Sequence, residues 1–225
     1  MMEKKKRATP WKSGKVVSIC LRNGVYILAQ MVRDPYLVFF NHFNEENNWK
    51  GVTLKEEDIL FCKAVTRQFL RYSPVAIIKE VNPLLDYELP KEWIYSHIGG
   101  HNITISVKGR ERQVVGFGQR CSLVLADKDS GQPEDNPLMG LFQAYIIPDI
   151  KEKDWDRVGQ AELMSIEVFP TLNERLYLCF LYGKNINPEQ DISLGKPLLD
   201  DYETYIDILT NSPEARHLYL GEYEE

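Results

Sequence analysis

The dipeptide Asn23-Gly24 stands between two apolar runs and constrains the start of this chain more than any other feature. A two-residue hairpin turn of type I′ needs a positive φ at both central residues, and asparagine followed by glycine adopts this turn readily. The flanking runs, residues 14–21 and 25–32, are rich in Val, Ile and Leu. The sequence therefore predicts an antiparallel hairpin over residues 14–32.

A third apolar run, residues 36–40, follows the turn Arg33-Asp34-Pro35 and extends the hairpin into a meander of three strands. Meanders of this kind begin many small barrels. The same reasoning predicts strands over residues 59–65, 75–81 and 122–126, and a second hairpin over residues 103–107 and 111–117.

The chain beyond residue 126 carries signals for both helices and strands. Residues 127–137 combine Asp, Ser, Gly and Pro, which indicates a linker. Pro137 suits the first position of a helix, and the apolar residues after it recur at helical spacing as far as Tyr145. Further on, the sequence predicts strands over residues 166–169 and 175–182, a loop over residues 183–197, and an amphipathic helix over residues 201–210.

These elements predict an α+β fold, with an N-terminal antiparallel β-meander or small barrel followed by a mixed helix and strand portion. Residues 1–13 are predicted to be a flexible basic tail. Residues 14–126 are predicted to form a β-rich domain, and residues 137–225 an α+β C-terminal portion. The sequence leaves open whether that portion packs on the first domain as one unit.

The cysteines and the hydropathy pattern indicate a soluble, intracellular protein. The four cysteines lie far apart and form no C-x-x-C pair, which favours buried reduced thiols over disulfides or a metal site. No apolar stretch approaches the ~18 residues that a membrane span needs. The basic start of the chain is followed by no apolar run, so no secretory signal is expected.

The histidines do not form a recognisable catalytic or metal-binding motif. His97 and His101 are four residues apart, but Gly99 and Gly100 lie between them and favour a loop over a helix that would align the two rings. The chain has no phosphate-binding loop, no nucleophile elbow and no complete dinucleotide-binding glycine motif. The sequence therefore predicts no catalytic residue, no metal ligand and no cofactor.

Acidic residues are concentrated at the C-terminal end. The chain carries a net charge of −6, which disfavours nonspecific binding to nucleic acid. From residue 200 onward there are eight acidic residues and one basic residue. A solvated helix face is the simpler interpretation. The functional one is an acidic docking surface for a basic partner, made by Asp200, Asp201, Glu203 and Asp207.

Residues 11–32, with the sequence WKSGKVVSICLRNGVYILAQMV, resemble the start of the immunity protein 26 family of bacterial polymorphic toxin systems. The shared pattern is a glycine-led strand, an Ile-x-Leu step, a glycine turn, a tyrosine and a later Gln-x-Val. Here it falls on Gly14, Ile19, Leu21, Gly24, Tyr26, Gln30 and Val32. Family members often have proline between the Ile and the Leu, where this chain has Cys20.

The resemblance implies an α+β protein of the bacterial cytoplasm that binds a cognate protein toxin and neutralises it by occluding its active site. It implies no catalysis and no cofactor. Toxins of these systems are often nucleases with basic substrate grooves, which agrees with the acidic charge. Two alternatives stay open: a nucleic-acid-binding small-barrel module, and an enzyme of unrecognised type with His97 or His101 at its site.

Overall fold

The computed structural model describes residues 8–97, 102–117, 120–126, 144–212, 215 and 218–219. The fold is α+β, as the sequence predicts. The chain forms two compact units that interleave along the sequence. The first, called here the meander unit, is drawn from residues 1–88, 165–186 and 204–225. The second, called here the hairpin unit, is drawn from residues 89–164 and 187–203.

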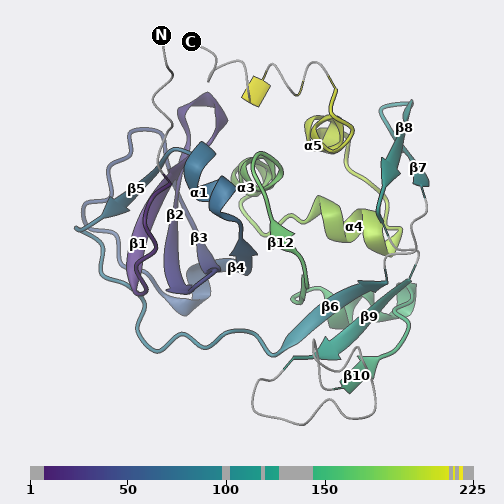
Figure 1. Ribbon diagram of the computed structural model, residues 1–225, viewed down its shortest axis with the longest axis horizontal. Helices are drawn as coiled ribbons and strands as arrows, with labels where there is room; N and C mark the ends of the chain where they lie inside the picture. Colours follow the sequence, from purple (N-terminus) through teal and green to yellow (C-terminus); the bar gives the residue numbers. More distant parts are fainter. Residues whose placement is uncertain are drawn as a thin grey trace. The chain divides into compact units, whose positions relative to one another are not determined.

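A six-stranded sheet in the order β12-β4-β3-β2-β1-β5 forms the meander unit (Figure 1). Strands β1 to β4 pair antiparallel in sequence order, which confirms the predicted meander and the strand over residues 59–65. The strands are β1 (Lys15–Cys20), β2 (Tyr26–Arg33), β3 (Tyr36–Asn44), β4 (Ile59–Val65), β5 (Val75–Ile78) and β12 (Ile166–Glu167). The single-turn helix η2 (Glu56–Asp58) precedes β4, and α1 (Arg67–Tyr72) follows it.

The turn between β1 and β2 has the predicted backbone geometry. Asn23 and Gly24 have φ of 59° and 72°, within the short helical turn η1 (Arg22–Gly24). The backbone N–H of Leu21 donates to the carbonyl of Val25 at 2.7 Å and closes the turn. Because asparagine and glycine tolerate positive φ better than other residues, this dipeptide fixes the register of the hairpin.

Strand β2 is buried on both faces. Its five consecutive residues from Ile27 to Met31 are all buried, a pattern typical of a sheet that is covered on both sides. Gln30 is the polar member of this run. Its side-chain amide donates to the carbonyl of Leu84 at 2.9 Å and accepts from the Leu84 N–H at 2.7 Å, so the buried polar groups are satisfied.

The segment after β12 is helical, and the prediction of a strand over residues 175–182 is wrong. Helix α3 (Thr171–Tyr182) is buried along most of its length, and only β12 at Ile166–Glu167 remains of the first predicted strand. A short run that is apolar on all sides cannot be assigned to helix or strand by periodicity. The local signal for a helix is Gly183, which ends α3 in the left-handed conformation at φ 63°.

The predicted amphipathic helix near residue 205 is confirmed. The short turn η4 (Asp200–Tyr202) leads into α5 (Glu203–Leu209), and Tyr202, Tyr205 and Ile206 are buried. Ile208 packs with Phe169, Ala215 and Tyr219 in a small apolar cluster within the meander unit.

The hairpin unit contains a four-stranded sheet in the order β10-β9-β6-β11 and a separate two-stranded hairpin, β7-β8. Its core comprises Ile94, Cys121, Leu123, Ile150, Val158 and Leu163. The strands are β6 (Glu92–His97), β7 (Asn102–Val107), β8 (Arg110–Val115), β9 (Arg120–Leu125), β10 (Ala144–Ile147) and β11 (Glu162–Leu163). The helices are η3 (Glu152–Asp154), α2 (Trp155–Val158) and α4 (Pro188–Leu194). The predicted hairpin and the strand near residue 122 are confirmed.

Two predictions in this unit are wrong where the structure describes them. Tyr145 lies in strand β10 opposite Val124 and not in a helix, because pairing with β9 overrides the helical spacing. The remainder of that predicted helix, residues 138–143, and the whole linker over residues 127–137 lie outside the described residues. Helix α4 occupies part of the predicted loop over residues 183–197.

The compact units differ from the predicted division at residues 126–137, because segments on both sides of that boundary enter each unit. The start of the chain also differs from a flexible tail over residues 1–13. Thr9 is held by its N–H, which donates to Leu70 at 3.1 Å, and by its hydroxyl, which donates to Val75 at 2.9 Å. Residues 1–7 lie outside the described residues.

None of the four cysteines forms a disulfide, and Cys62, Cys121 and Cys179 are buried, as predicted. Burial raises the pKa of the Cys121 thiol to about 11, which keeps it protonated and unreactive at neutral pH.

The burial of β2 predicts a large effect for one truncation. Ile27 is 0% exposed, so Ile27→Ala should lower the free energy of unfolding by about 2–5 kcal/mol, measured by urea denaturation. Leu85 is 75% exposed, and Leu85→Ala should change the free energy of unfolding by less than about 0.5 kcal/mol. Equal effects of the two substitutions would contradict the assignment of the core.

Candidate functional sites

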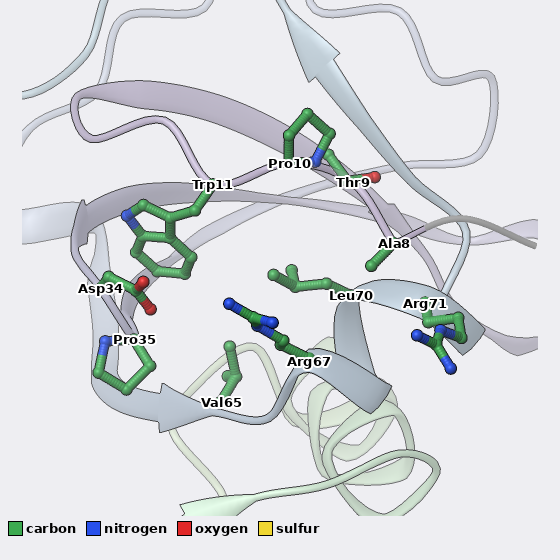
Figure 2. A pocket seen from close by; sticks show the side chains of 10 residues that line it. All are labelled: Ala8, Thr9, Pro10, Trp11, Asp34, Pro35, Val65, Arg67, Leu70 and Arg71. Carbon is green, nitrogen blue, oxygen red and sulfur yellow. The ribbon is translucent and has the colours of Figure 1, made fainter.

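A cavity of about 560 Å³ opens beside helix α1 in the meander unit (Figure 2). Ten residues line it, from the N-terminal segment, the turn between β2 and β3, the end of β4, and α1: Ala8, Thr9, Pro10, Trp11, Asp34, Pro35, Val65, Arg67, Leu70 and Arg71. Its frame is fixed by backbone hydrogen bonds. Besides the bonds of Thr9, the N–H of Val65 donates to Pro35 at 2.9 Å.

Helix α1 positions two arginines at this cavity. Thr66 caps the helix by accepting a hydrogen bond from the N–H of Phe69 at 3.2 Å. Arg67 and Arg71 are one helical turn apart, and both are exposed. Figure 2 shows the Arg67 guanidinium reaching between Trp11, Asp34 and Val65, whereas the Arg71 guanidinium lies at the other end of the cavity. The only local signal for this site is the spacing of the two arginines after a capping threonine.

The acidic residues predicted to bind a partner differ in their surroundings. Asp200 and Asp201 are exposed, whereas Glu203 and Asp207 are half-buried. Within the hairpin unit, Glu203 accepts a hydrogen bond from Lys108 at 2.9 Å and lies 3.4 Å from Arg110. The Lys108 ammonium lowers the pKa of the Glu203 carboxyl below its ordinary value. The charge of Glu203 is therefore compensated by the turn between β7 and β8.

His97 lies beside a serine, but the two do not form a nucleophile and its base. The Ser122 hydroxyl is fully buried and donates to the carbonyl of Pro148 at 2.6 Å. His97 Nε2 lies 2.8 Å from the same hydroxyl oxygen, so the ring is the donor of that hydrogen bond. The serine proton is already committed to a backbone carbonyl and is not available to the imidazole. His101 lies outside the described residues.

The ring of His97 is held between aromatic side chains. Tyr95 meets it edge-on at a centroid distance of 4.8 Å, and Tyr145 stacks on it at 6.3 Å. Partial burial lowers the pKa of His97 below its ordinary value, the Arg120 guanidinium lowers it further, and Asp149 raises it in part. The neutral form of this histidine is therefore favoured in the folded protein.

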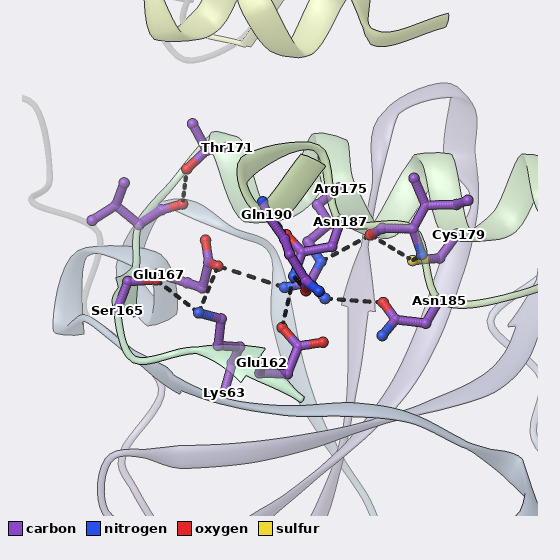
Figure 3. Close-up of polar contacts among 12 residues, drawn as sticks. Lys63, Glu162, Ser165, Glu167, Thr171, Arg175, Cys179, Asn185, Asn187 and Gln190 are labelled. Carbon is purple, nitrogen blue, oxygen red and sulfur yellow. Dashed lines mark hydrogen bonds and ion pairs between the residues drawn. The ribbon is translucent and has the colours of Figure 1, made fainter. Parts of the chain in front are cut away.

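Lys63 and Arg175 form a buried ionic cluster with Glu167 in the meander unit (Figure 3). Lys63 Nζ donates to Ser165 Oγ at 2.7 Å and lies 3.4 Å from Glu167 Oε1, and Arg175 Nη1 lies 3.6 Å from the same oxygen. The Arg175 guanidinium also donates to the carbonyl of Ile186 at 3.0 Å and covers the ring of Phe61 at 3.7 Å. The two cations and the one carboxylate of this cluster are all closed to solvent, so we interpret it as structural.

A second buried cluster surrounds Glu174 of α3. Its carboxylate is fully buried and accepts two hydrogen bonds from Arg22, at 2.9 and 3.1 Å, and one from the hydroxyl of Tyr219. Burial and the adjacent carboxylate raise the pKa of Tyr219 well above its ordinary value. The Arg22 guanidinium also stacks over the ring of Tyr177 at 3.6 Å. This cluster anchors the turn of the first hairpin to α3.

Within the part of the chain that the structure describes, no three His, Cys, Asp or Glu side chains gather in a way that could hold a metal ion. None of the helices in those same residues has the length and apolar character to cross a membrane.

A family model described as Domain of unknown function (DUF8309) matches residues 5–119, which is about half of the chain. The protein belongs to the DUF8309 family. No curated protein and no solved structure matches the chain. All the residues that line the cavity of Figure 2 lie inside the DUF8309 match, whereas Asp200, Asp201, Glu203 and Asp207 lie outside it.

Removing the buried carboxylate should destabilise the meander unit. Glu174→Ala leaves the Arg22 charge and the Tyr219 hydroxyl without their partner and should cost about 3–5 kcal/mol in urea denaturation. Glu57→Gln is the matched control, because Glu57 is exposed and pairs only with the exposed Lys55 among the described residues. A Glu174→Ala variant as stable as the control would contradict the anchoring role.

The surroundings of His97 predict a titration below its ordinary pKa of 6.5, measured by NMR. Since the unfolded chain takes up this proton first, stability from the neutral ring is present above pH 6.5 and is lost as pH falls below it. Arg120→Gln should raise the measured pKa toward 6.5, because it removes a neighbouring positive charge. A pKa at or above 6.5 in the unaltered protein would contradict the assignment.

Proposed function

We propose that this protein is an immunity protein of the bacterial cytoplasm, which binds a cognate toxin and neutralises it by covering the toxin's active site. The observation that carries the proposal is the N-terminal meander. The residues that resemble the immunity protein 26 family, 11–32, include strands β1 and β2 and the Asn-Gly turn between them. Gln30, one of the residues of the shared pattern, is buried and satisfied by the backbone of Leu84.

Inhibition by occlusion needs an accessible surface of suitable charge, and Asp200 and Asp201 supply one. Glu203 contributes less, because Lys108 and Arg110 compensate its charge. A basic substrate groove on the toxin would attract exposed carboxylates, and opposed potentials raise the rate of encounter more than the final affinity. Asp200 and Asp201 are therefore the principal contacts proposed here, with Glu203 and Asp207 as lesser ones.

Two further features support a role without catalysis in this cellular compartment. The hydroxyl of Ser122 donates to a backbone carbonyl, so the arrangement around His97 offers no activated nucleophile. The four thiols form no disulfide and are mostly buried, which agrees with a reducing compartment, where disulfides do not persist.

The product of the neighbouring gene is the partner to test, because immunity genes normally lie beside the genes of their toxins. Surface plasmon resonance with that product should give an association rate that falls as salt rises. Asp200→Lys with Asp201→Lys should slow association by about tenfold or more, whereas Glu203→Lys should have a smaller effect. Lys79→Glu, which changes an exposed charge in the meander unit, is the control.

Absence of binding, or a neighbouring product without toxicity, would refute the proposal. An unchanged association rate after Asp200→Lys with Asp201→Lys would refute the proposed acidic contact but not the proposed toxin binding. Retention of RNA by the purified protein at low salt would instead favour the nucleic-acid-binding alternative. Its structural support is a groove of about 440 Å³ lined by three lysines that form no ion pair among the described residues: Lys12, Lys15 and Lys79.

A further inference from the structure

The cavity beside α1 has no role in the proposed toxin binding, and it has the features of a small-molecule site. Its volume of about 560 Å³ lies within the range of such sites, which is roughly 300–1,000 Å³. Backbone hydrogen bonds of Thr9 and Val65 hold its walls in place. The cavity is therefore formed before any ligand enters.

One end of the cavity presents two opposite charges that have no partner among the described residues. Figure 2 shows the Asp34 carboxylate, from the turn between β2 and β3, pointing toward the Arg67 guanidinium of α1. Neither side chain makes a hydrogen bond or ion pair with any residue that the structure describes. Within the described part of the chain, no side chain competes with a ligand for either group.

This pair of charges discriminates among ligands by their own charge. A simple anion would gain a contact with Arg67 but would be repelled by Asp34. A simple cation would gain a contact with Asp34 but would be repelled by Arg67 and Arg71. A ligand with a carboxylate and an ammonium group close together satisfies both side chains at once, and its carboxylate can form a charge-assisted hydrogen bond to the guanidinium.

The rest of the lining is largely apolar. Trp11, Pro35, Val65 and Leu70 contribute aromatic and aliphatic surface next to the charged end. Burial of an apolar group against such a wall is favourable in proportion to the area removed from water. The complementary ligand therefore carries a large apolar side chain beside its two charges.

We propose that this cavity binds a free α-amino acid with a large apolar or aromatic side chain. The carboxylate of the ligand pairs with Arg67, its ammonium group pairs with Asp34, and its side chain packs against Trp11 and Leu70. This inference does not depend on the proposed toxin binding, and either can fail without the other.

The test is a titration of the full chain with L-phenylalanine, followed through the indole N–H signals in ¹H–¹⁵N NMR spectra. The Trp11 signal is identified by its loss in Trp11→Phe. L-phenylalanine should shift this signal saturably, with a Kd of about 1 mM or tighter. 3-Phenylpropionate lacks the ammonium group and phenethylamine lacks the carboxylate, so each should bind about tenfold more weakly.

Substitutions then assign each charge to its partner. Asp34→Asn should weaken the binding of L-phenylalanine by about tenfold, so that it binds no more tightly than 3-phenylpropionate. Arg67→Gln should likewise make L-phenylalanine bind no more tightly than phenethylamine. Lys50→Gln, which removes an exposed charge outside the cavity, should leave binding unchanged. The proposal is overturned if the three probes bind equally, if none binds, or if binding leaves the Trp11 signal unmoved. The comparison of probes needs no variant, so it stands even where a substitution disturbs folding.

Discussion

The buried carboxylate of Glu174 joins the three chain segments from which the meander unit is built. Arg22 comes from the first segment, Glu174 from the second and Tyr219 from the third, and all three meet in one set of hydrogen bonds. An ionised carboxylate without such partners would be costly at this depth, because the Glu174 side chain is fully removed from solvent. The turn of the first hairpin therefore makes its buried contacts only when Glu174 and Tyr219, which are distant in the sequence, pack against it.

This dependence explains which parts of the fold were predictable from sequence. The Asn23-Gly24 turn and the apolar runs that flank it are local features, so the meander was predicted correctly. Helix α3 was mistaken for a strand because its surroundings, and not its own periodicity, decide its conformation. Helix α4 carries local signals that were overlooked, with Asn187 as its cap, Pro188 at its first position and Gly195 at its end. Helix α1 is too short for periodicity to reveal.

The candidate functional residues also differ in whether local sequence or the tertiary fold reveals them. The acidic residues from 200 to 207 could be found by counting charges, but the compensation of Glu203 by Lys108 and Arg110 depends on a hairpin almost a hundred residues away. The cavity combines residues from four separate segments, and no motif connects Trp11 or Asp34 with Arg67. The resemblance at the N-terminus concerns the strands that support this cavity, and it gave no indication of the cavity itself.

We propose that this protein acts by occupying the surface of another molecule and performs no reaction itself. A stoichiometric titration tests this most directly: the activity of the neighbouring gene's product is measured as purified protein is added at concentrations far above the Kd. Occlusion predicts that toxin activity falls in proportion to the protein added and reaches its minimum at one equivalent. Complete loss of activity at a small fraction of an equivalent would show turnover and contradict the account, as would full activity in the presence of excess protein.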